Sequence, residues 1–104
     1  MKGLTILAAL VLASGLAHAA EVEVSQKNRA FAPQNLKVKV GDTVGFKNDD
    51  QVSHNVFSLS DAKTFDTGAY PGGQTKKVVF DKPGTVEVEC AIHPDMKMIV
   101  EVQK

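Results

Sequence analysis

Apolar and polar residues alternate one for one in several short stretches of this chain. The clearest are 21–25, 36–40 and 85–90, where aliphatic side chains alternate with polar or charged ones. A period of two is typical of a β-strand that buries one face. By the same pattern we expect strands over 43–47, 53–58, 75–80 and 97–103. We also expect an extended piece at 31–33, which Pro33 keeps out of a sheet centre.

Turn residues separate these stretches. Gly41-Asp42 interrupts the alternation, residues 48–51 are polar, and Pro83-Gly84 combines two residue types that turns favour. Residues 59–74 show no periodicity, so we expect a long irregular connection there. No stretch carries a helical repeat of useful length. Seven to eight short strands joined by turns predict an all-β fold, a Greek-key β-sandwich.

The first nineteen residues follow a different pattern. Lys2 precedes an apolar run over 4–16, and Ala17-His18-Ala19 has the small-x-small form of a cleavage site. We therefore predict a signal peptide at 1–19 and a mature domain at 20–104. The apolar run is shorter than the roughly 20 residues that span a bilayer. No cysteine near the cleavage site offers a lipid anchor, so we expect a soluble periplasmic protein.

Composition narrows the possible partners and stabilising devices. The 12 basic and 12 acidic residues balance, and no basic stripe suggests nucleic acid. We expect a monomer without a membrane anchor. Cys90 is the only cysteine, so it cannot form a disulfide within the chain. An unpaired thiol is a liability in an oxidising compartment, whereas a metal that holds the thiolate would protect it and stabilise a small fold.

The chemistry-bearing residues concentrate near the C-terminus. Residues 90–98 contain Cys90, His93 and two of the three methionines, Met96 and Met98. A thiolate, an imidazole and a thioether form a soft, mixed ligand set. One more imidazole, available from His54, would complete a His₂Cys site with a weak axial methionine, the arrangement of blue-copper electron-transfer centres.

Each of these residues also has a purely structural interpretation. Alternation places Cys90 on one face with the valines of 85–90, where it could be a small buried hydrophobe. That interpretation does not explain His93 three residues later, with Pro94 beside it, so we favour ligands at both positions. His54 alone would be read as a surface or hydrogen-bonded histidine, and the downstream set favours a ligand.

The two methionines compete for the axial position. Met98 shares a face with Val100 and Val102, which makes it a core residue by pattern. Met96 precedes that alternation at the end of the loop, where packing does not call for an apolar side chain. We therefore predict Met96 as the axial ligand, and Met98 remains the alternative.

Together these segments resemble the cupredoxin family of type 1 blue copper proteins. The resemblance rests on 40–48, 54–56, 65–68, 71–72 and 83–90, and the C-x-x-H-x-x-M spacing is most similar to that of amicyanins. A longer gap, as in plastocyanins and pseudoazurins, would select Met98. The resemblance implies one copper ion held by His54, Cys90 and His93, with Met96 axial.

The resemblance also implies supporting residues. Asn48 matches the asparagine that ties the two ligand-bearing segments together. The position after the cysteine often carries a hydroxyl in the family, and here it is Ala91, so Asn48 would bond to backbone. An apolar patch for electron transfer would be built from Val52, Ile92, Pro94 and the pair Tyr70-Pro71. Asp95 adds a charge beside that face, so methylamine dehydrogenase does not follow as the partner.

The leading functional hypothesis is a soluble one-electron carrier, not an enzyme, that meets a dehydrogenase, cytochrome or oxidase transiently. A copper-binding or delivery protein without an electron-transfer role is the alternative. A Cys90 nucleophile activated by His93 would need an orienting acid, and none is evident in sequence beside that pair. Zinc would suit His54, Cys90 and His93 but leaves Met96 unexplained.

Overall fold

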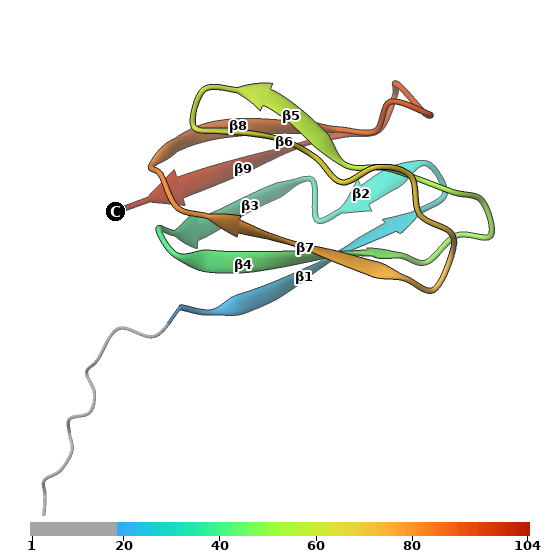
Figure 1. The fold of residues 1–104 in the computed structure, drawn as a ribbon, viewed down its shortest axis with the longest axis horizontal. Coiled ribbons are helices and arrows are strands. Elements are labelled where there is room, and N and C mark those ends of the chain that lie inside the picture. The colour runs from blue at the N-terminus through green and yellow to red at the C-terminus, as the bar shows by residue number, and fades with distance from the viewer. Residues whose placement is uncertain (1–18) are drawn as a thin grey trace, which may run out of the picture.

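The computed structural model describes residues 19–104, so the predicted signal peptide lies outside the described residues except for Ala19. Nine strands form within the described range (Figure 1). They are β1 (Glu21–Lys27), β2 (Ala30–Ala32), β3 (Asn35–Lys39), β4 (Asp42–Asn48), β5 (Phe57–Ser60), β6 (Lys63–Asp66), β7 (Thr75–Phe80), β8 (Gly84–Glu89) and β9 (Lys97–Gln103). In the same range no helix is long and apolar enough to cross a membrane.

The strands form two sheets that face each other across the core (Figure 1). One sheet has the order β2-β1-β4-β7 and the other β3-β9-β8-β5-β6. The pairs β1–β4 and β3–β9 are parallel, and the remaining neighbours are antiparallel. The all-β sandwich predicted from the alternation is confirmed.

Alternation along the strands builds the core, as the sequence predicted. In β8, Val86 and Val88 are fully buried, and they lie opposite Val100 and Met98 of β9. Cys90 follows on the same face and is 1% exposed. Each fully buried Val or Met side chain stabilises the fold by roughly 1.5–3 kcal/mol relative to exposure. The face that packs the core therefore runs directly into the ligand loop.

The region after His54 differs from the prediction. The expected strand over 53–58 begins only at Phe57, and residues 59–74, expected to be irregular, contain the end of β5 and all of β6. The reason is an inverted pattern, because Ser58 is buried and Leu59 is 77% exposed. A buried serine beside an exposed leucine hides the second half of β5, and β6 buries no side chain fully, so the described residues form nine strands where seven or eight were expected.

A two-residue turn joins β1 to β2 and lies beside the connection that carries His54. Asn28 and Arg29 have φ of 55° and 58°. Two successive positive φ values match the type I′ turn, which suits the twist of paired strands. The turn directs the Asn28 amide to the side chain of Asp50, in the β4–β5 connection, at 2.9 Å.

Candidate metal centre

Three side chains from two distant segments converge at one end of the sandwich. His54 lies between β4 and β5, Cys90 directly follows β8, and His93 lies in the loop before β9. The two Nδ1 atoms are 3.1 Å apart, and the Cys90 Sγ is 3.7 Å from the His54 Nδ1. The donor atoms of all three residues lie within 4.8 Å of one another. The structure thus brings together the three residues that the sequence singled out.

The chemistry of this donor set suits a soft cation. Two Nδ1 atoms at 3.1 Å can share at most one proton, and the buried thiol beside them is a donor in its thiolate form. A cation at their common point would bind both nitrogen lone pairs and the sulfur. Imidazole and thiolate together are ligands that copper and zinc accept. The residues therefore fit a copper ion of the kind the sequence predicted.

The loop between Cys90 and β9 is closed by its own backbone. The Met96 amide donates to the His93 carbonyl at 2.9 Å, and the Cys90 amide donates to the Met96 carbonyl at 3.2 Å. Met96 is fully buried at the end of this loop. The expectation that packing does not call for an apolar side chain at this position is wrong, because Met96 belongs to the buried core cluster.

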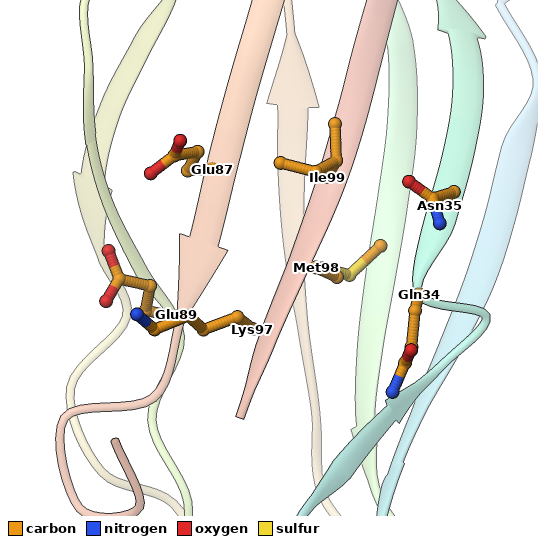
Figure 2. Close-up of a pocket in the computed structure, with 7 residues that line it drawn as sticks. All are labelled: Gln34, Asn35, Glu87, Glu89, Lys97, Met98 and Ile99. Carbon is orange, nitrogen blue, oxygen red and sulfur yellow. The ribbon is translucent and has the colours of Figure 1, made fainter. Parts of the chain in front are cut away.

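Met98 differs from Met96 in its place rather than its burial. Met98 is 2% exposed and lies one residue inside β9, opposite Val88. Figure 2 shows it on the five-stranded sheet with the residues that line a groove of about 330 Å³. None of the three donor residues lines this groove. Met98 therefore continues the strand packing, as its alternation predicted, and the groove is separate from the donor cluster.

Asp50 contacts the far side of the His54 ring. The His54 Nε2 and an Asp50 carboxylate oxygen are 2.7 Å apart, and the His54 side chain is completely buried. When Nε2 carries the proton and donates to the carboxylate, Nδ1 presents its lone pair to the cluster. Burial acts to raise the pKa of Asp50, but hydrogen bonds from the Asn28 amide, the His54 ring and the Arg29 amide outweigh it, so its pKa lies below the usual carboxyl value.

The link between the two ligand-bearing segments is made by a different asparagine from the expected one. Asn48 does bond to backbone, donating to the carbonyls of Val52 at 2.9 Å and Tyr70 at 3.1 Å. Both partners lie around His54, so Asn48 does not reach the Cys90 loop. Asn55 does, because its Oδ1 accepts the Ala91 amide at 2.7 Å. The position directly after His54 was the signal that could have identified Asn55.

Tyr70 is also placed differently from the prediction. It is 1% exposed and so does not belong to a surface patch. Its backbone pairs with His54 through two hydrogen bonds, of 2.8 and 3.1 Å, and its hydroxyl donates to Gln26 and to the Phe46 carbonyl. Burial, and then the nearby Cys90, raise the pKa of Tyr70, which keeps the hydroxyl a donor. Tyr70 therefore fastens the His54 backbone to the four-stranded sheet.

Apolar side chains are nevertheless exposed beside the donors in the sequence. Val52 is 51% and Ile92 is 48% exposed, and Pro94 is exposed as well. His93 is the half-buried member of the donor set. Val52, Ile92 and Pro94 are thus exposed, as a patch would require, and the charged Asp95 is exposed as well.

The structure shows an arrangement around Cys90 that resembles an activated nucleophile and that the sequence did not reveal. Cys90, His54 and Asp50 stand in the order thiol, imidazole, carboxylate, at 3.7 and 2.7 Å. An orienting acid therefore does exist, beside His54 rather than His93. However, a nucleophile must be reached by its substrate, and Cys90 is only 1% exposed. Burial makes this thiol suited to holding a metal ion rather than to attacking a substrate.

Comparison with known sequences places the chain among copper proteins. The family model for copper binding proteins of the plastocyanin/azurin family matches residues 18–103. Two relatives come from Methylorubrum extorquens. The methylamine utilization protein MauL is 33% identical over 98% of this chain and 92% of its own length. Amicyanin-alpha is 31% identical over 84% of this chain and 76% of its own length.

Solved structures agree with this result. A mutant amicyanin with Cu(I) has a TM-score of 0.74 and 26% identity over 80% of this chain and 82% of its own. The purple cupredoxin from Nitrosopumilus maritimus has a TM-score of 0.69 and 29% identity over 81% and 99%. A copper-containing nitrite reductase from Thermus scotoductus has a TM-score of 0.75 and 29% identity over 81% of this chain but 22% of the reductase. The last similarity is thus to one part of a larger chain.

Proposed function

This chain belongs to the plastocyanin/azurin family of copper-binding proteins, and from that premise we propose that it is a soluble one-electron carrier and not an enzyme. The family binds copper, and the convergence of two Nδ1 atoms and one buried sulfur within 4.8 Å is the observation that supports a single copper site here. A bound copper ion would supply the one-electron chemistry by alternating between Cu(I) and Cu(II).

We assign the three strong ligands from the distances between their donor atoms. His54 and His93 would bind through Nδ1 and Cys90 through its thiolate, because those atoms face one another. Met96, whose backbone closes the same loop, would be the weaker fourth ligand by the C-x-x-H-x-x-M spacing, with Met98 as the alternative. This assignment uses soft ligands that suit both oxidation states of copper.

Three contacts favour a site that keeps its shape while the charge changes. The Asn55 side chain holds the Ala91 amide, Tyr70 holds the His54 backbone, and two backbone hydrogen bonds close the Cys90–Met96 loop. Each restrains one of the segments that carry the ligands. Electron transfer benefits because a preformed site needs little rearrangement, whereas copper delivery needs exchangeable, exposed ligands.

His93 is the natural exit for the electron. It is the half-buried donor, and its sequence neighbours Ile92 and Pro94 are exposed. A partner could therefore approach this ring closely through a small apolar contact, of the size used by weak redox complexes. We propose transient partners of the dehydrogenase, cytochrome or oxidase class, met by a monomer without a membrane anchor.

The location follows from the sequence pattern. Residues 1–19 have the composition of a secretory signal, and β1 begins two residues later, at Glu21. We propose that residues 20–104 act as the mature cupredoxin domain in the periplasm. Mass spectrometry of the protein recovered from the periplasm tests this, and a mass that retains residues 1–19 would contradict it.

Voltammetry of the copper-loaded protein tests the carrier function. We expect a reversible one-electron wave with copper retained over repeated cycles, including in the presence of a Cu(I) chelator. A delivery protein would instead lose its copper to the chelator on reduction, and that result would reject the carrier. Cys90→Ser serves as the control, because removing the thiolate should abolish the reversible wave.

A further inference from the structure

The carboxylate of Asp50 links a surface turn to the buried ring of His54. One oxygen accepts the Asn28 amide at 2.9 Å, and the other lies 2.7 Å from the His54 Nε2. The Asp50 amide in turn donates to the Asn48 side chain at 2.9 Å. The carboxylate is therefore fixed from both sides, and its direction toward the ring is set by the fold rather than by a free rotamer.

We propose that Asp50 is a positioning residue that orients His54 and stabilises the oxidised form of the site, an inference that rests on the proposed copper carrier. A carboxylate that accepts a hydrogen bond from the protonated ring nitrogen fixes the tautomer of the imidazole. It also makes the opposite nitrogen a stronger ligand. Its negative charge also favours the more positive oxidation state. Both effects favour Cu(II) over Cu(I) and so lower the reduction potential.

Burial makes this charge effective. The Asp50 side chain is 14% exposed and the His54 side chain 0%, so little water lies between the charge and the ring. The neighbouring Asp49 carries the same charge, but its side chain is 33% exposed and its partners are Ser25 and Lys47, the latter at 3.7 Å. Asp49 is thus a matched control, adjacent in sequence and equal in charge, without contact to the ring.

The decisive comparison is between Asp50→Asn and Asp49→Asn in the copper-loaded protein. An amide offers a single acceptor oxygen, so Asp50→Asn cannot keep the bonds to both Asn28 and His54. We expect Asp50→Asn to shift the reduction equilibrium toward Cu(I) by about tenfold, which is about 59 mV for one electron. It should also weaken Cu(II) binding by roughly 10- to 100-fold. Asp49→Asn should change the equilibrium by less than about twofold, since exposed charges are screened.

A spectroscopic readout separates positioning from general stability. Electron spin echo modulation of Cu(II) reports the quadrupole coupling of the remote imidazole nitrogens, which depends on their hydrogen bonds. We expect one of the two remote nitrogens to change in Asp50→Asn and neither to change in Asp49→Asn. Thermal unfolding and far-UV circular dichroism of the metal-free variants establish that each variant is folded.

The outcomes distinguish the inference from the function on which it rests. If wild-type protein gives no thiolate–copper absorption, the carrier proposal fails and the role of Asp50 fails with it. If wild type is blue and both variants shift the potential equally, Asp50 acts only as a distant charge and the inference is wrong. An unchanged potential and unchanged nitrogen coupling in Asp50→Asn would also overturn it.

Discussion

The two histidines of the site are held in opposite ways. His54 is fully buried, its ring contacts Asp50, and its backbone pairs with Tyr70. His93 is half-buried in a loop whose residues 91, 92, 94 and 95 are exposed. One imidazole is therefore built into the sandwich and the other lies at its surface. The contrast separates two tasks within one donor set, since the first ring fixes the site and the second leaves it accessible.

Removing each imidazole in turn tests most strongly whether the two histidines are held differently. His54→Ala leaves a cavity and the Asp50 carboxylate without its ring partner, so we expect the metal-free protein to lose about 2–4 kcal/mol of unfolding free energy. His93→Ala removes a half-buried loop side chain, so its loss should be below about 1 kcal/mol. Urea unfolding of both metal-free variants measures the difference.

Copper binding provides the second half of that test. Both variants should lose tight copper binding, because each removes one of three strong donors. Equal destabilisation of the metal-free forms would show that the two rings are held alike, contrary to the contrast in their burial.

A smaller loss of stability is expected from removing the hydrogen bond between Asn55 and Ala91, which joins the His54 segment to the Cys90 loop. Asn55→Ala leaves the Ala91 amide without its acceptor, which should cost about 1–3 kcal/mol. Because the bridge joins the His54 segment to the Cys90 loop, Cu(II) affinity should also fall. Asn48→Ala is the comparison variant: Asn48 supports the His54 side through Val52, Tyr70 and Asp50 but does not bridge to the Cys90 loop, so Cu(II) affinity should fall less than in Asn55→Ala. A greater loss of Cu(II) affinity in Asn48→Ala than in Asn55→Ala would contradict the assignment.

The smallest change in stability is expected from a substitution of Asp42, at the start of β4 and away from the donor residues. Hydrogen bonds from the Lys39 and Ala20 amides lower the pKa of Asp42. A lowered folded-state pKa adds stability above the unfolded-state pKa and loses it as pH falls through the folded value. Asp42→Asn should therefore be less stable than wild type near neutral pH, and the difference should close in acid below about pH 4.

Unfolding free energies measured across pH check this expectation. The copper spectrum of Asp42→Asn should match that of wild type, because Asp42 contacts none of the donors. A stability difference between wild type and Asp42→Asn that grows as the pH falls would contradict the expected sign.

Much of this arrangement was readable from the sequence because it depends on local pattern. The alternation that buries Val86, Val88 and Cys90 also points the thiol inward, and the spacing to His93 marks the ligand loop. The sandwich and the two donors Cys90 and His93 follow from such short-range regularities. His54 was reached differently, from the second imidazole that the ligand set called for and from the resemblance of residues 54–56 to the cupredoxins.

The supporting residues were harder to predict because their partners are distant in the chain. Asn55 and Ala91 are 36 residues apart. The Asp50 carboxylate is held by the Asn28 amide, 22 residues earlier. The place of Asn55 directly after His54 is a local clue, but the Ala91 amide that it binds is far away in the chain. Tyr70 was predicted to be a surface residue because nothing near it in sequence shows its partners. Gln26 and Phe46 lie 44 and 24 residues earlier, in strands of the four-stranded sheet.

The central claim is that Cys90, His54 and His93 form one constrained copper site. Visible absorption and electron paramagnetic resonance of the purified protein after addition of Cu(II) test it most directly, with Cys90→Ser measured alongside. We expect an intense blue band and a narrow copper hyperfine splitting in wild type, both absent in the variant. A weak tetragonal copper spectrum that Cys90→Ser leaves unchanged would contradict it.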